Sequence, residues 1–213
     1  MKKWVFFDVM GVVFIVGDDT NDLLVPFIRK KNPQISIEKI NKAYLEASLG
    51  NISSLKFWSL MELGEADYSV VETEYLDSKL KMDEYIPKVF RELSRYYNIG
   101  LLSNDLSEWS IYLRKKYKLD KYLQCSIISG DVKCRKPQKQ IYEIALKKAN
   151  CSAKDCIFID DRLKNLYPAA ELGMNVVKFN REEDFDATLN FSQAKSISEI
   201  PNIVYSVFGD KVN

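Results

Sequence analysis

Histidine is absent from the 213-residue sequence. Its absence excludes histidine-based acid–base catalysis, the Ser-His-Asp and Cys-His arrangements that activate a nucleophile, and every zinc site with histidine ligands. Any catalysis in this chain must therefore use carboxylates, lysine, hydroxyl groups, backbone amides or a hard cation.

Cysteine is sparse as well. The chain has four cysteines, with no CxxC pair and no spacing typical of a metal site: Cys125, Cys134, Cys151 and Cys156. We predict reduced thiols that act mostly as packing residues.

A strong charge and a long apolar run are also missing. The formal net charge of +1 creates no long-range field that would attract nucleic acid or an anionic membrane. No apolar run approaches the roughly 20 residues that span a bilayer, and Asp8 interrupts the N-terminal run too early for a signal peptide. We predict a cytoplasmic protein with no nucleic-acid partner and no membrane partner; the sequence does not indicate an oligomeric state.

The sequence does contain enough apolar residues for a substantial core. It is 46% hydrophobic and 29% charged, as ordinary globular proteins are. Its length suits one full domain with a modest insertion. From about Asp19 to Asp77, apolar residues recur at three- and four-residue intervals with no convincing strand, which predicts a helical insertion.

Strands and helices alternate in the rest of the chain. The predicted strands are Trp4–Phe7, Ile99–Leu102, Cys125–Ile128, Cys156–Ile159 and Asn175–Phe179. The predicted helices are Tyr85–Tyr97, Leu106–Tyr117, Gln138–Ala149, Leu163–Leu172 and one around Ser198–Phe208. This alternation predicts an α/β fold, a doubly wound parallel sheet with helices on both faces.

Polar side chains stand at the ends of three predicted strands: Asp8, then Ser103 and Asn104, then Asp160 and Asp161. Reactive groups gather at the carboxyl ends of strands in doubly wound sheets. Crowded carboxylates need a cation, a lysine or a proton, and oxygen ligands without histidine favour Mg²⁺. Individually, these residues also suit turns and helix starts.

Lys136 is the basic residue with an unusual position. It precedes Pro137 at a predicted helix start, and a residue before proline is held extended. That conformation would aim the side chain away from the helix. A solvated surface lysine is the simpler alternative.

Four segments together resemble the motifs of the haloacid dehalogenase superfamily of hydrolases. They are FFDVMGVVF (6–14), LLSN (101–104), Lys136-Pro137 with Ile141-Tyr142, and FIDDR (158–162) with Asn165, Ala169 and Gly173-Met174. The resemblance implies a Rossmann-like core domain, residues 1–15 and 80–213, and a small helical-bundle cap domain, residues 16–79. It also implies a phosphatase that acts on a small phosphorylated substrate.

The same resemblance implies roles for individual residues. Asp8 would be the catalytic nucleophile that forms an aspartyl phosphate, and Lys136 would neutralise charge on Asp8 and the phosphoryl group. Ser103 and the amide of Asn104 would hold that group. The implied Mg²⁺ site consists of Asp8, the backbone carbonyl of Met10, Asp161 and, nearby, Asp160.

Met10 departs from the family pattern. Phosphatases of the family carry a second aspartate there, which acts as general acid and base, an effect worth about 10²–10⁴ in rate. Three interpretations stay open: a weakened or specialised Mg²⁺-dependent phosphatase, a dehalogenase, whose reaction needs no proton at this position, and a non-catalytic protein that binds phosphate or a partner.

Substrate specificity is expected to come from the cap. The residues that we consider for the lining of its cleft are Asp18, Asp19, Asn21, Lys56 and Trp58. For Trp58 a place in the core of the cap is the simpler interpretation, because it falls on an apolar helical stripe. For Asp18 and Asp19 the simpler interpretation is a hinge turn with a helix N-cap.

Overall fold

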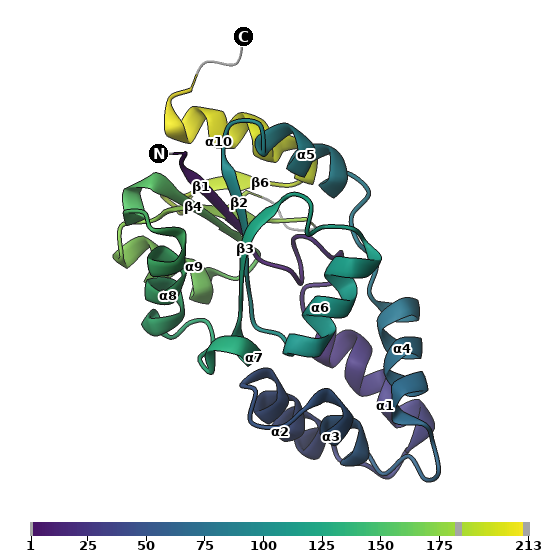
Figure 1. Cartoon of the computed structure of the whole chain (residues 1–213). Helices are drawn as coiled ribbons and strands as arrows, with labels where there is room; N and C mark the ends of the chain where they lie inside the picture. Colours follow the sequence, from purple (N-terminus) through teal and green to yellow (C-terminus); the bar gives the residue numbers. More distant parts are fainter. Residues whose placement is uncertain (1, 182–184, 211–213) are drawn as a thin grey trace.

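The computed structural model of the chain describes residues 2–181 and 185–210 (Figure 1). Met1 and the segments 182–184 and 211–213, which the sequence assigns to the core domain, lie outside the described residues. Within the described ranges, every helix is too short or too polar to cross a bilayer.

One parallel sheet of six strands organises the fold, in the order β3-β2-β1-β4-β5-β6. The strands are β1 Trp4–Phe7, β2 Asn98–Ser103, β3 Leu123–Ile128, β4 Cys156–Asp160, β5 Asn175–Phe179 and β6 Ser192–Ala194. β1 lies in the middle, and the chain adds β2 and β3 on one side of it before it crosses to β4 on the other. The predicted doubly wound α/β fold is confirmed.

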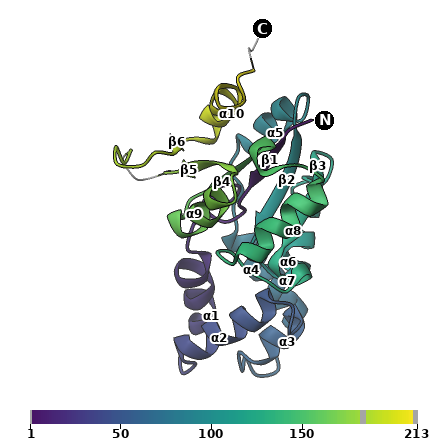
Figure 2. The same ribbon diagram turned by 90° about the vertical axis from the view of Figure 1, so that its left-hand side faces the viewer.

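Helices cover both faces of the sheet (Figures 1 and 2). Alternate β1 residues belong to two apolar clusters, Val5 and Phe7 to one and Trp4 and Phe6 to the other. The first cluster includes residues of α5 Ile86–Leu93, α6 Ser107–Lys116 and α10 Ile200–Phe208, and the second those of α8 Lys139–Ala149 and α9 Leu163–Glu171. Both faces of β1 are therefore buried, which explains its continuous apolar sequence.

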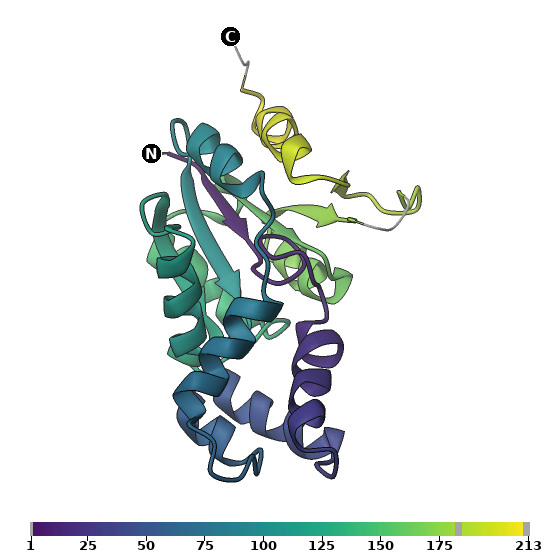
Figure 3. The ribbon, with the colours of Figure 1, turned by 90° about the vertical axis from the view of Figure 1, so that its right-hand side faces the viewer.

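Between β1 and α5 every element is helical. These are η1 Thr20–Leu24, α1 Val25–Lys31, α2 Ile37–Ser48, α3 Ser54–Ser59 and α4 Tyr68–Lys79. They gather at one end of the sheet (Figures 1 and 3). The indole N–H groups of Trp58 on α3 and Trp109 on α6 both donate to one carboxylate oxygen of Glu72 on α4, at 2.9 and 2.8 Å. The inserted helices thus share an aromatic core with the sheet domain.

Several short elements carry too little pattern to be predicted. β6 has three residues, and α7 Ser129–Val132 and the 3₁₀ turns η2 Ala153–Asp155 and η3 Ile197–Glu199 are equally short. Helix α4 was not distinguished within the insertion because its buried residues are few and do not mark a sharp stripe. Gly173, which follows α9, has φ +89°, the left-handed conformation in which glycine commonly ends a helix. The thiols of Cys134 and Cys156 are buried, as expected of packing residues.

Candidate active site

The strand ends bring the predicted site residues together. Phe7 on β1 pairs with Leu101 on β2 and with Ile159 on β4, so Asp8 emerges between the ends of those two strands. The backbone N–H of Asp8 donates to the carbonyl of Ile159 at 2.9 Å. The change of direction in strand order lies at β1, where ligands bind in doubly wound sheets.

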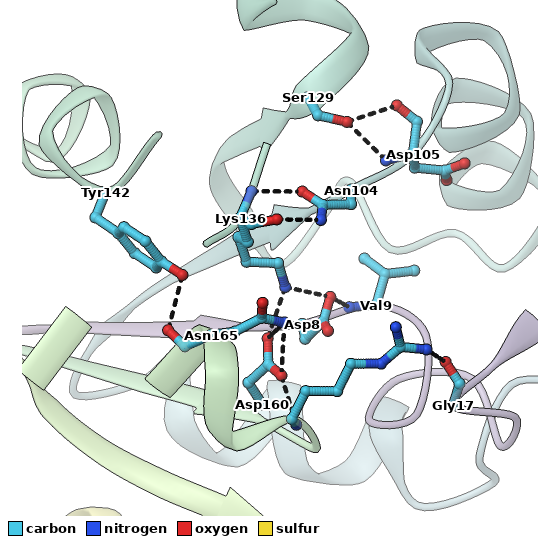
Figure 4. Close-up of polar contacts among 11 residues, drawn as sticks. Asp8, Val9, Gly17, Asn104, Asp105, Ser129, Lys136, Tyr142, Asp160 and Asn165 are labelled. Carbon is cyan, nitrogen blue, oxygen red and sulfur yellow. Dashed lines mark hydrogen bonds and ion pairs between the residues drawn. The ribbon is translucent and has the colours of Figure 1, made fainter. Parts of the chain in front are cut away.

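Lys136 lies between two carboxylates (Figure 4). Its Nζ is 2.8 Å from Asp8 Oδ1 and 2.7 Å from Asp160 Oδ2, and all three side chains are buried. Burial alone lowers the pKa of the Lys136 ammonium, but Asp160 and Asp8 raise it above its ordinary value. Burial and the Asp160 charge raise the pKa of Asp8. The surface alternative for Lys136 is therefore wrong.

Asp160 accepts several hydrogen bonds from the protein. The Asn165 side-chain amide donates to both of its oxygens at 3.0 Å, and the Arg162 backbone N–H donates to Oδ1 at 2.7 Å. Tyr142 in turn donates from its hydroxyl to the Asn165 carbonyl at 2.7 Å. With Lys136 on Oδ2, this carboxylate orients the lysine.

Asn104 holds Lys136 from the backbone side. Its Oδ1 accepts from the Lys136 N–H at 2.8 Å, and its Nδ2 donates to the Lys136 carbonyl at 2.9 Å (Figure 4). The side-chain amide of Asn104 is thus occupied within the protein. Its backbone N–H is the group left to meet a ligand.

Asp161 fits tightly against the loop that follows β1. A Cβ on Gly11 would lie 2.4 Å from Asp161 Oδ2, and one on Gly17 would lie 2.5 Å from the same atom. Gly11 also has φ +85°, a conformation that favours glycine. These two glycines therefore permit the carboxylate to approach Asp8.

Three carboxylates surround a place suited to a divalent cation. Asp8, Asp160 and Asp161 each offer an oxygen, and these oxygens lie within 4.8 Å of one another. Lys136 balances one of the three negative charges, and Arg162 and Lys178 partly offset the charge of Asp161. Asp161 Oδ1 is buried without a hydrogen-bond partner among the described residues, and burial and Asp160 raise the pKa of Asp161 to about 6. An all-oxygen donor set of this charge fits Mg²⁺.

Beside the carboxylates lies a cavity of about 60 Å³. Its lining consists of Asp8, Met10, Gly17, Asp19, Thr20, Tyr44, Ser103, Asn104, Arg135, Lys136, Arg162 and Asn165. Ser103 Oγ is buried with no hydrogen-bond partner in the described part of the chain. A hydroxyl group without a partner is costly to bury, and this one is among the residues that line the cavity.

Of the residues considered for the cleft, the structure places one in the cavity lining and the others elsewhere. Asp19 lines the cavity, whereas Asn21 and Lys56 are exposed away from it and Trp58 is buried in the aromatic core, as the simpler interpretation held. The capping prediction applies to Asp18, whose carboxylate accepts from the backbone and side chain of Asn21. Asp19 occupies the N-cap position of η1, but its side chain makes no cap hydrogen bond.

Gly17, Thr20, Tyr44 and Arg135 line the cavity but were not singled out from the sequence. Arg135 comes directly before the Lys136-Pro137 motif, and Arg162, also in the lining, is the last residue of the FIDDR motif. Arg135 lies 5.7 Å from the centroid of the Tyr44 ring and hydrogen-bonds Ser48. Arg162 donates to the Gly17 carbonyl. The signal in the sequence that could have identified these two arginines is their position in or beside a motif.

Comparison with protein families matches residues 7–179 to the haloacid dehalogenase-like hydrolases. The chain belongs to this family, and it is a hydrolase of the haloacid dehalogenase superfamily. The predicted family is confirmed.

Known relatives include both dehalogenases and phosphatases. The (S)-2-haloacid dehalogenase 4A of Burkholderia cepacia is 25% identical over 161 residues, 68% of this chain and 69% of that protein. A glyceraldehyde 3-phosphate phosphatase of Pyrococcus abyssi is 33% identical over 92 residues, 42% of this chain and 37% of that protein.

Solved structures share the fold. A haloacid dehalogenase family enzyme of Bacteroides thetaiotaomicron superposes with a TM-score of 0.75 at 21% identity, over 86% of this chain and 96% of that one. Its complex with magnesium and inorganic phosphate gives a TM-score of 0.70 at 20% identity, over 87% and 98%.

Proposed function

We propose that this hydrolase is a Mg²⁺-dependent phosphatase for a small phosphorylated substrate, acting through an aspartyl phosphate on Asp8. The observation that carries the proposal is the cluster of three carboxylates around one buried ammonium, next to a buried hydroxyl with no partner among the described residues. Burial and Asp160 raise the pKa of both Asp8 and Asp161, and a divalent cation would stabilise their charged forms. The relatives include phosphatases, and an enzyme of the same fold has been solved with magnesium and phosphate.

Each residue has a task in the proposed reaction. The Asp8 carboxylate attacks phosphorus and displaces the leaving oxygen, and water then cleaves the aspartyl phosphate. Lys136 stabilises charge on the transferring oxygens, while Ser103 Oγ and the Asn104 N–H hold them. Asp8, Asp161 and the Met10 carbonyl would hold Mg²⁺, which supplies further positive charge at the phosphoryl oxygens. Asp160 would position Lys136.

The cavity limits the substrate. A volume of about 60 Å³ has room for about four to six water-sized groups, and a phosphoryl group fills most of them. We propose that residues 16–79 act as a cap over the site, and their contribution to the lining consists of Gly17, Asp19, Thr20 and Tyr44. A phosphoryl group leaves little of this cavity for the rest of the substrate, which favours a small leaving group.

A dehalogenase function suits the site less well. A halide leaves carbon without a cation to stabilise it, so a dehalogenase has no use for the Asp161 oxygen that is buried without a partner among the described residues. Displacement of a halide also gives no role to the paired Asp160 and Asp161. The similarity to a known dehalogenase makes this activity the natural second assay.

Turnover assays test the proposal. The purified protein is expected to hydrolyse p-nitrophenyl phosphate and acetyl phosphate with Mg²⁺ and to lose this activity in EDTA. Chloride release from 2-chloropropionate without metal would overturn the proposal in favour of a dehalogenase. No turnover of any substrate, together with binding of inorganic phosphate in calorimetry, would indicate a non-catalytic phosphate-binding protein.

Ser103→Ala is expected to lower the activity of the protein while it raises its stability. Removal of a buried hydroxyl that has no partner raises the free energy of unfolding by about 1 kcal/mol. The same change removes a phosphoryl ligand, so kcat/KM falls by about 10²-fold or more. Urea unfolding and Mg²⁺-dependent turnover measure the two effects. Ser110→Ala, also buried but outside the cavity, is the control, and equal activity in both variants would contradict the role of Ser103.

Gly17→Ala tests the approach of Asp161 to the metal site. The new methyl group would meet Asp161 Oδ2 at 2.5 Å and push the carboxylate away, so Mg²⁺ affinity is expected to fall by about 10–100-fold. Titration calorimetry with MgCl₂ measures the change. Val16→Ala, one residue earlier, is the control. An unchanged Mg²⁺ affinity in Gly17→Ala would show that Asp161 is not a ligand.

A further inference from the structure

We propose that Asp19 is the general acid and base of this site: it protonates the leaving oxygen and then takes a proton from the attacking water. The inference rests on the proposed phosphatase function and deepens it. It assigns to the start of the inserted helices the proton transfer that Met10 has no group to perform.

The residues that line the cavity limit which group can act as the general acid and base. Among the described residues that line it, Asp8 and Asp19 carry the carboxyl groups. Asp8 is committed to attack on phosphorus and is ion-paired with Lys136. The lining also contains tyrosine, lysine and arginine side chains. Arginine does not release its proton in proteins. Asp19 is thus the carboxyl group free to exchange a proton with a leaving oxygen.

The surroundings of Asp19 suit proton transfer at neutral pH. The side chain is 6% exposed, and burial raises its pKa to about 7, with Arg162 acting in the opposite direction. A general acid and base works best when its pKa lies near the working pH. The charged and titratable groups around it come from every neighbouring element: Asp18 before η1, Tyr44 on α2, Tyr75 on α4, Asp105 after β2, Arg135 before α8 and Arg162 after β4.

The two adjacent aspartates have separate roles. Asp18 is exposed, and its carboxylate accepts hydrogen bonds from Asn21 at the start of η1. Asp19 is buried instead and belongs to the lining of the cavity, and the hydrogen bond to its carboxyl group comes from its own backbone N–H. A carboxyl group needed only to begin a helix would not be buried in this way.

The proton balance of the reaction is complete. In the first step the Asp8 oxygen bonds to phosphorus, the bond from phosphorus to the leaving oxygen breaks, and the Asp19 proton moves to that oxygen to give an alcohol. In the second step a water oxygen bonds to phosphorus, its proton moves to the Asp19 carboxylate, and the bond from phosphorus to Asp8 breaks. Phosphate leaves, and both aspartates return to their starting states.

Substrates with different leaving groups test this role. Asp19→Asn is expected to lower kcat for ethyl phosphate by about 10²–10⁴-fold, because an alkoxide needs a proton to leave. The rate for formation of the aspartyl enzyme from p-nitrophenyl phosphate, whose phenolate leaves unprotonated, is expected to change little. In the wild type the ethyl phosphate rate falls as pH rises above about 7, because the acid loses its proton; in Asp19→Asn this decline disappears.

Controls make each outcome decisive. Asp22→Asn, an exposed aspartate on the same helical turn, should match the wild type on both substrates. Inorganic phosphate affinity in the presence of Mg²⁺, measured by calorimetry, shows whether Asp19→Asn keeps an intact site, and Met10→Asp added to that variant should restore part of the ethyl phosphate rate. Equal loss on both substrates, or no loss, would overturn the role of Asp19. A wild type inactive on every phosphate would instead overturn the proposed function itself.

Discussion

Asp8→Asn is expected to abolish hydrolysis of every phosphate substrate, with kcat falling by more than about 10⁴-fold. The asparagine amide has nearly the shape of the carboxylate but lacks the nucleophilic oxygen that must bond to phosphorus. Because Asp8 stands at the end of a central strand with its N–H bonded to Ile159, the backbone has no reason to move. The loss therefore reports chemistry rather than folding.

Stability provides the second measurement on the same variant. Burial and Asp160 raise the pKa of Asp8, so its charged form is disfavoured in the folded protein without metal. A neutral side chain relieves this repulsion, and the free energy of unfolding in EDTA is expected to stay equal or rise. Asp131→Asn, at an exposed position, is the control. Residual turnover within tenfold of the wild type would rule out Asp8 as the nucleophile.

Lys136→Met is expected to damage both stability and activity. Removal of the ammonium leaves Asp8 and Asp160 as buried carboxylates without their shared partner, and breaking a buried ion pair costs about 3–5 kcal/mol. Turnover is expected to fall by about 10²–10³-fold, the usual effect of removing one charge-stabilising donor from an active site. Urea unfolding in EDTA and Mg²⁺-dependent turnover measure the two losses.

Magnesium should restore part of the stability lost in Lys136→Met, since a cation that binds the folded state alone shifts the unfolding equilibrium. Lys139→Met is the matched control, because Lys139 is exposed and its pair with Glu143 at 3.5 Å lies on the surface, where ion pairs contribute about 0–1 kcal/mol. If the two lysine variants unfold at the same urea concentration, Lys136 does not balance the buried carboxylates.

The strands and the principal helices of the core could be predicted from the sequence because their signals are local. Apolar runs such as Trp4–Phe7 and the helical spacing of α8 are visible within a few residues, and the polar residue that follows each strand marks the carboxyl edge of the sheet. Asp8, Ser103 and Asp161 lie at one site because each of them stands where a strand ends at that edge. This result does not depend on which helices cover the faces of the sheet.

The burial of the site residues and their pairing with one another depend on contacts between segments that are far apart in the chain. Asn104 bonds the backbone of Lys136, 32 residues later, and Lys136 reaches Asp160, 24 residues later again. No local pattern distinguishes these side chains from ordinary capping or surface residues. The same is true of β6, whose three residues form a strand because β5 lies beside them.

Asp18 and Asp19 show most clearly which properties follow from the sequence and which depend on the tertiary structure. By itself the sequence determined the fold class and the chemistry available, carboxylates and lysine without histidine, because composition and periodicity belong to the chain. Only the tertiary structure decided that one aspartate caps a helix in water while its neighbour enters the cavity. The free energy of a carboxyl group depends on the dielectric and the charges around it, and segments far apart in the chain supply both.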